Sequence, residues 1–194
     1  MIFKERVYSV LIVSASESFN KSLMSMLPET DYYPVSVTSS VGAARRSLLE
    51  RQYDFILINT PLPDDFGSRL AVDICSGSNS VALLFVKNEL YDEIYSKVVD
   101  YGVMTLSKPI STQTVSQSLR MLCAMRERLR RLEKKTASVE EKMEEIRLVN
   151  RAKWTLISAL GMTEADAHKY IEKQAMDRCV AKREIAEGII KTYK

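Results

Sequence analysis

Few residues of this 194-residue sequence have the types and spacing needed for catalysis or metal binding. The three cysteines, Cys75, Cys123 and Cys179, are scattered and form no Cys-x-x-Cys pair, so we expect free thiols in a reducing cytoplasm. The one histidine, His168, rules out a histidine-cluster metal site and has no catalytic partner at a usable spacing. We therefore expect no metal, no cofactor and no enzymatic activity.

The elements that could position other reactive side chains lie in the first half of the chain. Five short runs rich in Val, Ile and Leu predict strands, at 7–13, 33–37, 55–59, 81–86 and 103–106. Four helix-like segments alternate with them, at 17–27, 41–51, 66–75 and 89–101. Strands that are apolar almost throughout are typical of a parallel sheet covered on both faces. The pattern predicts an α/β, flavodoxin-like (βα)5 domain over residues 1–111, closed by the start of a following helix.

In such sheets, ligands bind beyond the carboxyl ends of the strands, which here points to Ser14, Ala15, Asn59, Val86 and Lys108. Three stretches around these residues resemble the receiver domain of bacterial response regulators in two-component systems. "YDFILINTPLPDDFG" (53–67) resembles the stretch that carries the phosphoryl-accepting aspartate, "LSKPI" (106–110) the Lys-Pro motif, and "LIVSASESF" (11–19) the Mg²⁺-binding acid pair. The resemblance covers residues 7–120 and implies the receiver fold.

The residues that perform the chemistry of that family are absent. The acceptor position holds Asn59, whose amide is a poor nucleophile and brings no charge to Mg²⁺. Ser14 and Ala15 replace the acid pair, and Lys108 alone remains. We therefore expect a degenerate phosphorylation site in a pseudo-receiver that docks and dimerises without aspartyl phosphate. The family also implies a cis peptide bond between Lys108 and Pro109.

Residues 110–160 contain neither Pro nor Gly and carry an apolar heptad repeat, which predicts one long helix. One helix cannot bury its own apolar seam, so we expect a coiled-coil dimerisation segment over residues 112–149. Charges at Arg128 and Glu133, and at Lys135 and Glu140, would attract across a parallel pair. The alternative is one amphipathic helix that packs back on its own domain. The expected seam residues are Leu122, Met125, Leu129, Leu132, Val139, Met143 and Ile146.

The final segment, residues 150–194, predicts a compact three-helix bundle. Gly161 can end the long helix, and Thr163 with Asp166 forms a capping box that starts a second helix reaching about residue 179. A third helix is expected over about 182–192, poorly capped because Ala181 offers no acceptor.

The stretch "NRAKWTLISALGMTEADAHKYIEKQAMDRCVAKREIAEGII" (150–190) resembles the ANTAR domain, an RNA-binding antiterminator module. The sequence departs from the family at Trp154, where Gly is common, and at Ala181, where Ser is common. The resemblance implies a dimer that binds tandem RNA stem-loops in leader transcripts and prevents a terminator hairpin from forming. The expected RNA contacts are Lys153, Arg178, Lys182 and Arg183. Trp154 and Tyr170 are either core residues or stacking surfaces for bases.

Charge is distributed unevenly along the chain. Residues 1–111 carry 10 Lys and Arg against 13 Asp and Glu, whereas residues 112–194 carry 18 against 12. A basic half suits a polyanionic partner such as RNA. The alternatives are a DNA-binding response regulator, although no helix-turn-helix spacing is evident, and a protein-interaction scaffold whose charges are merely solvated.

No apolar run approaches the roughly 18 residues that a membrane span requires, so we expect a cytoplasmic protein without a membrane partner. A regulatory protein that opens or sequesters the coil would control such a dimer.

Overall fold

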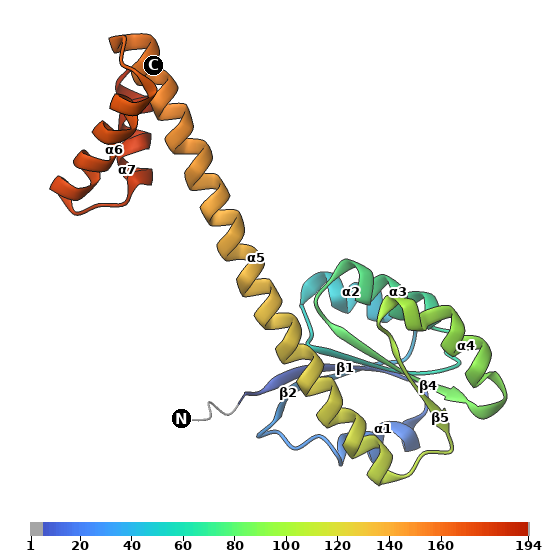
Figure 1. The fold of residues 1–194 in the computed structure, drawn as a ribbon. Helices are drawn as coiled ribbons and strands as arrows, with labels where there is room; N and C mark the ends of the chain where they lie inside the picture. Colours follow the sequence, from blue (N-terminus) through green and yellow to red (C-terminus); the bar gives the residue numbers. More distant parts are fainter. Residues whose placement is uncertain (1–5, 194) are drawn as a thin grey trace. The chain divides into compact units, whose positions relative to one another are not determined.

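A computed structural model of the chain describes residues 6–193 (Figure 1). The chain divides into two compact units, Met1–Arg130 and Arg131–Lys194. In the part of the chain that the structure describes, no helix is long and apolar enough to cross a membrane.

The first unit contains a five-stranded parallel sheet in the order β2-β1-β3-β4-β5. The strands are β1 (Tyr8–Val13), β2 (Tyr32–Thr38), β3 (Phe55–Asn59), β4 (Val81–Lys87) and β5 (Met104–Lys108). The helices are α1 (Glu17–Met24), α2 (Val41–Glu50), α3 (Ser68–Gly77) and α4 (Tyr91–Val98), with 3₁₀ turns η1 (Asn88–Leu90) and η2 (Val99–Tyr101) flanking α4. The predicted flavodoxin-like (βα)5 fold is thus confirmed.

Helices cover both faces of this sheet, as its continuous apolar strands require. Helices α2, α3 and α4 lie on one face and α1 with the start of α5 (Thr112–Leu160) on the other (Figure 1). Each face of the sheet has its own hydrophobic core, and alternate residues of β1 point to the two faces. Leu11 packs in the core under α2–α4, whereas Ile12 packs in the core under α1 and α5. Because all five strands are parallel, the carboxyl ends of β1, β3 and β5 lie at the same edge of the sheet.

The start of α5 is part of this unit, which differs from the expectation for Leu122. Leu122 is fully buried against the sheet, and Met125 and Leu129 pack partly against the same cluster. The unit accordingly reaches Arg130, past the boundary expected at residue 111. The physical reason is that the second sheet face needs a helix besides α1, and the first apolar positions of α5 supply it. In this conformation Leu122 cannot also contact a partner chain.

An ionic cluster that was not predicted from the sequence holds α5 against the first unit near Arg126 and Arg130. The Oδ1 atom of Asp54 accepts hydrogen bonds from Arg126 Nε at 2.8 Å and from Arg130 Nη2 at 2.7 Å, while its Oδ2 atom accepts one from Ser9 N at 3.0 Å. Burial opposes ionisation of Asp54, but the bonds from Ser9 and Arg126 and the charge of Arg130 outweigh it and lower the pKa. The cluster joins the beginning of β3 to the helix.

The second unit is a small helical bundle. Besides the end of α5 it contains α6 (Glu164–Arg178) and α7 (Lys182–Thr192), which share a core formed by Val149, Ala152, Leu156, Ala167, Ile171, Ala175, Ile185, Ala186 and Ile189. The Thr163 hydroxyl accepts from Asp166 N at 3.1 Å, as the capping box predicts. Gly161 lies in the left-handed region at φ 66°, and Ala181 caps α7 without a side-chain acceptor.

Candidate functional site

Three of the four side chains of the degenerate phosphorylation site meet at the edge of the sheet. Lys108 donates from Nζ to Asn59 Oδ1 at 2.8 Å and to the Thr60 carbonyl oxygen at 2.6 Å. Asn59 donates from Nδ2 to the buried Ser14 Oγ at 3.0 Å. The oxygen and the nitrogen of the Asn59 amide are thus both hydrogen-bonded to protein side chains. Ala15 contributes no polar side-chain atom, and the Lys108–Pro109 peptide bond is cis, as the resemblance implied.

The charge of Lys108 is not matched by a carboxylate in this network. Burial, and then the positive charge of Lys87 on the neighbouring strand, lower the pKa of Lys108. The ammonium is satisfied instead by the neutral oxygens of Asn59 and Thr60. The arrangement stabilises a cation by polar oxygens, and residue 59 offers an amide in place of a carboxylate.

The residues present do not fit Mg²⁺, which prefers carboxylate and other oxygen ligands in octahedral geometry. The two carboxylates that follow Asn59 along the chain, Asp64 and Asp65, are engaged elsewhere. Asp64 accepts from the backbone N–H groups of Val41 and Gly42, at 2.9 Å each, and these bonds lower its pKa. Asp65 accepts from Gly67 N at 2.7 Å. The capping of α2 by Asp64 joins segments distant in the sequence, so no local pattern predicted it.

The four expected RNA-contact residues all lie on the bundle, but they differ in their surroundings. Lys153 pairs with Glu164 at 3.0 Å, Lys182 with Glu172 at 2.5 Å and Arg183 with Glu187 at 2.9 Å. Arg178 makes no ion pair with any residue in the range 6–193. Of the four expected contact residues, Arg178 is therefore the one whose charge is not neutralised by a described residue.

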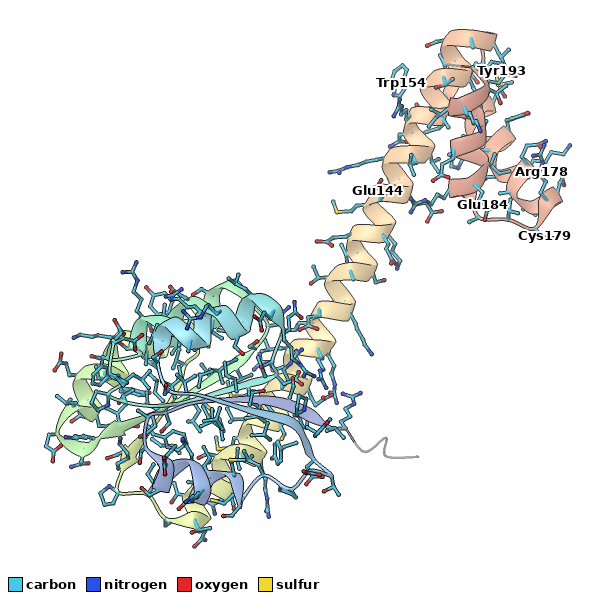
Figure 2. All side chains as sticks on the ribbon, turned by 180° about the vertical axis from the view of Figure 1, so that it is seen from behind. Glu144, Trp154, Arg178, Cys179, Glu184 and Tyr193 are labelled. Atoms are coloured by element: carbon cyan, nitrogen blue, oxygen red, sulfur yellow. The ribbon has the colours of Figure 1, made fainter. Side chains whose placement is uncertain are left out.

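The aromatic residues whose placement the sequence left open are both accessible. Trp154 is 69% exposed, and Figure 2 shows its ring standing away from α5. Tyr170 is 40% exposed. It lines a groove of about 220 Å³ between α6 and α7, together with Gln174, Arg178, residues of α7, and Tyr193 directly after α7. Gln174 and Tyr193 were not among the residues predicted from the sequence to contact RNA. One feature of the sequence could have indicated Gln174. Tyr170, Gln174 and Arg178 are spaced by four residues, which places them on one helix face.

The seam expected between two chains is exposed beyond the first unit. Leu132, Val139, Met143 and Ile146 are each about half exposed on α5, although they are large and apolar. They are spaced by three and four residues, so they share one side of the helix.

Comparison with known proteins relates both units to established families. Residues 137–190 match the ANTAR domain. Over 184 residues the chain is 27% identical to the transcriptional regulatory protein PdtaR of Mycobacterium tuberculosis, covering 94% of this chain and 89% of PdtaR.

Solved structures with a similar fold include receiver domains. One is the signal receiver domain of an HD domain-containing protein from Pseudomonas fluorescens Pf-5, with a TM-score of 0.58 and 20% identity over 68% of this chain and 96% of that chain. Another is the receiver domain of the TMAO respiratory system response regulator TorR, with a TM-score of 0.52 and 24% identity over 60% of this chain and 96% of that chain. Identities this low show the fold alone.

Proposed function

The chain is an ANTAR-domain response regulator with a receiver-type fold, and from that premise we propose that it is an RNA-binding transcription antiterminator. In this proposal a parallel homodimer binds tandem hairpins of a leader transcript and prevents a terminator hairpin from forming. The observation that carries the proposal is the ANTAR match over residues 137–190, which includes most of the helical bundle and the seam residues Val139, Met143 and Ile146.

The RNA-binding surface proposed is formed by Lys153, Arg178, Lys182 and Arg183. Three of these cations hold glutamate partners on the protein surface, namely Glu164, Glu172 and Glu187, each of which is at least 41% exposed. Exposed ion pairs are weak and are screened by salt. RNA phosphates can therefore replace the carboxylates, so binding should weaken steeply as the salt concentration rises.

The dimer proposed is held by Leu132, Val139, Met143 and Ile146 on α5. Large apolar side chains at heptad spacing gain stability by meeting their equivalents on a second helix. Two bundles carried by one coil would bind two hairpins at once. The second binding event then becomes intramolecular, which raises overall affinity by about 10²–10⁴.

The receiver domain is proposed to act without phosphorylation. Asn59 occupies the acceptor position and bonds with Ser14 and Lys108, and these residues supply no carboxylate to bind Mg²⁺ or to accept a phosphoryl group. Control of the dimer would then come from a regulatory protein that binds the domain or the coil. In this reading the domain is a pseudo-receiver, spanning residues 1–111 with the start of α5 completing its fold.

Filter binding of the full-length protein tests the proposal. Tight binding to a tandem-hairpin RNA at physiological salt is expected, with a large loss when one hairpin is deleted. The variant that carries K153Q, R178Q, K182Q and R183Q together should lose most of this binding. The matched control neutralises four exposed cations of the receiver domain, with K21Q, R46Q, R51Q and K97Q, and should bind as the parent does.

Other results would assign other functions. Equal or tighter binding to duplex DNA of the same sequence would make the protein a promoter-binding response regulator. Absence of binding to both nucleic acids, even at low salt, would leave a protein-interaction scaffold. Unchanged RNA binding by the four-fold bundle variant would place the RNA interface elsewhere.

A further inference from the structure

We infer that the groove between α6 and α7 receives one unpaired RNA base that carries an exocyclic amino group. The inference rests on the proposed RNA-binding function and names the part of the RNA that this site would read. The groove has a volume of about 220 Å³ and is separate from the ion-paired cations Lys153, Lys182 and Arg183.

Two helix faces form the groove. From α6 it is lined by Tyr170, Gln174 and Arg178. On the other side it is lined by residues of α7 that include Glu184, and by Tyr193 directly after the helix. Figure 2 shows Arg178 and Glu184 near the turn that joins the two helices, with Tyr193 toward the other end. The buried side chains of Ile185 and Ile189 also line it. An apolar lining with aromatic and polar groups around it suits a flat, partly polar ligand.

The polar groups of the groove are available to a ligand. Within residues 6–193, the side chains of Gln174, Arg178 and Glu184 make no hydrogen bond or ion pair, unlike Lys153, Lys182 and Arg183. The rings of Tyr170 and Tyr193 are about two-fifths exposed. Sequence-specific RNA recognition uses this combination, in which an unstacked base packs on an aromatic ring while side chains bond to its edge.

The signs of the charges favour a base over a free anion. Glu184 would repel a phosphate placed inside the groove, but its carboxylate can accept a hydrogen bond from the amino group of adenine, cytosine or guanine. Gln174 offers both a donor and an acceptor to a base edge. Arg178 can bind the phosphate that follows the base. The segment 150–194 carries nine Lys and Arg against six Asp and Glu, so its overall charge favours RNA.

Gly188 keeps the groove open. It lies within α7, where glycine is a poor helix former, and it lines the groove. A methyl group added there would meet no atom within 4 Å, so close packing does not require glycine at this position. Larger side chains at residue 188 would occupy the space assigned to the base.

Substitutions at Gly188 separate RNA binding from folding. Alanine and leucine are both better helix formers than glycine, so G188A and G188L should retain or raise the melting temperature. RNA affinity should fall modestly for G188A and roughly tenfold or more for G188L, in line with the usual value of base stacking on aromatic rings. G77L in α3 is the matched control, because a side chain at residue 77 also meets open space but lies in the receiver domain.

Abasic substitutions in the RNA identify the base. Removing one loop base at a time should reveal a position at which the parent protein loses roughly tenfold in affinity but G188L loses almost nothing further. Uracil at that position should also weaken binding by the parent. E184Q should reduce this discrimination against uracil, because the neutral amide is a weaker acceptor.

The outcomes distinguish this inference from the proposed function. If the parent binds no tandem-hairpin RNA, the proposed function itself fails. If the parent binds but G188L and E184Q bind equally well, with the same base preference, the groove inference is overturned while the RNA-binding function stands. An equal loss on base removal for the parent and G188L overturns it as well.

Discussion

Lys108 donates a hydrogen bond from Nζ to Asn59 Oδ1 at 2.8 Å, which joins the carboxyl ends of β5 and β3. The Nδ2 atom of the same Asn59 amide donates a hydrogen bond to Ser14 Oγ, directly after β1. Because an amide is neutral, Asn59 satisfies hydrogen bonds of the Lys108 ammonium without neutralising its charge. Asn59 therefore links Lys108 to Ser14 and brings no carboxylate to the strand ends.

The first prediction concerns phosphorylation. Incubation with acetyl phosphate and Mg²⁺ should leave the intact mass of the protein unchanged, because Asn59 offers no nucleophilic carboxylate. N59D alone should also remain unmodified, since Ser14 and Ala15 supply no carboxylate for Mg²⁺. The informative control is the triple variant S14D, A15D and N59D, which restores the acid set. Stoichiometric addition of phosphate to the parent would contradict the pseudo-receiver proposal.

The second prediction concerns the coil. V139K combined with I146K places like charges in the proposed seam and should convert the dimer to a monomer at micromolar concentration, as measured by light scattering. E141K combined with E144K changes exposed positions outside the seam and should preserve the dimer. The melting of the receiver domain should not change in either variant. A stable monomer for the parent protein would refute the dimer itself.

The third prediction concerns Asp54 and the pH dependence of stability. Its pKa is lowered in the folded state, because the bonds from Ser9 and Arg126 and the charge of Arg130 outweigh the effect of burial. A carboxyl group of this kind contributes stability that is complete above its unfolded pKa, about 3.9, and is lost as pH falls through the folded value. D54N should therefore reduce the free energy of unfolding by roughly 1–3 kcal/mol at neutral pH.

That difference should shrink on acidification below about pH 4, as followed by urea denaturation at a series of pH values. D73N is the control, because Asp73 forms an exposed pair with Arg45 at 2.5 Å and should change stability little at any pH. A difference for D54N that is constant from pH 7 to pH 3 would argue against the charged cluster.

The fourth prediction concerns the bundle. Leu156 is fully buried in its core, so L156A should destabilise this unit by about 2–5 kcal/mol. W154A, two residues earlier on the same helix, removes a larger side chain that is mostly exposed and should cost much less. Thermal melting followed by circular dichroism compares the two. A larger cost for W154A than for L156A would mean that Trp154 is packed.

Much of the fold followed from local patterns in the sequence. The apolar runs predicted all five strands because strands covered on both faces are continuous in Val, Ile and Leu. Helix ends at Gly161 and Thr163 followed from capping, which depends on adjacent residues alone. The missing chemistry at Asn59 was also evident, since the chemical type of a side chain is independent of the packing around it.

Tertiary structure decided the rest, because it depends on which distant segments meet. The heptad pattern assigned Leu122 to a partner chain, but packing uses it to cover the sheet of its own domain. The pairing of Asp54 with Arg126 joins residues 72 positions apart. The groove in which Tyr170 and Tyr193 take part exists only when α6 and α7 fold against each other. Sequence alone thus determined the elements and the missing chemistry, whereas tertiary packing decided which side chains are buried, paired or available to a ligand.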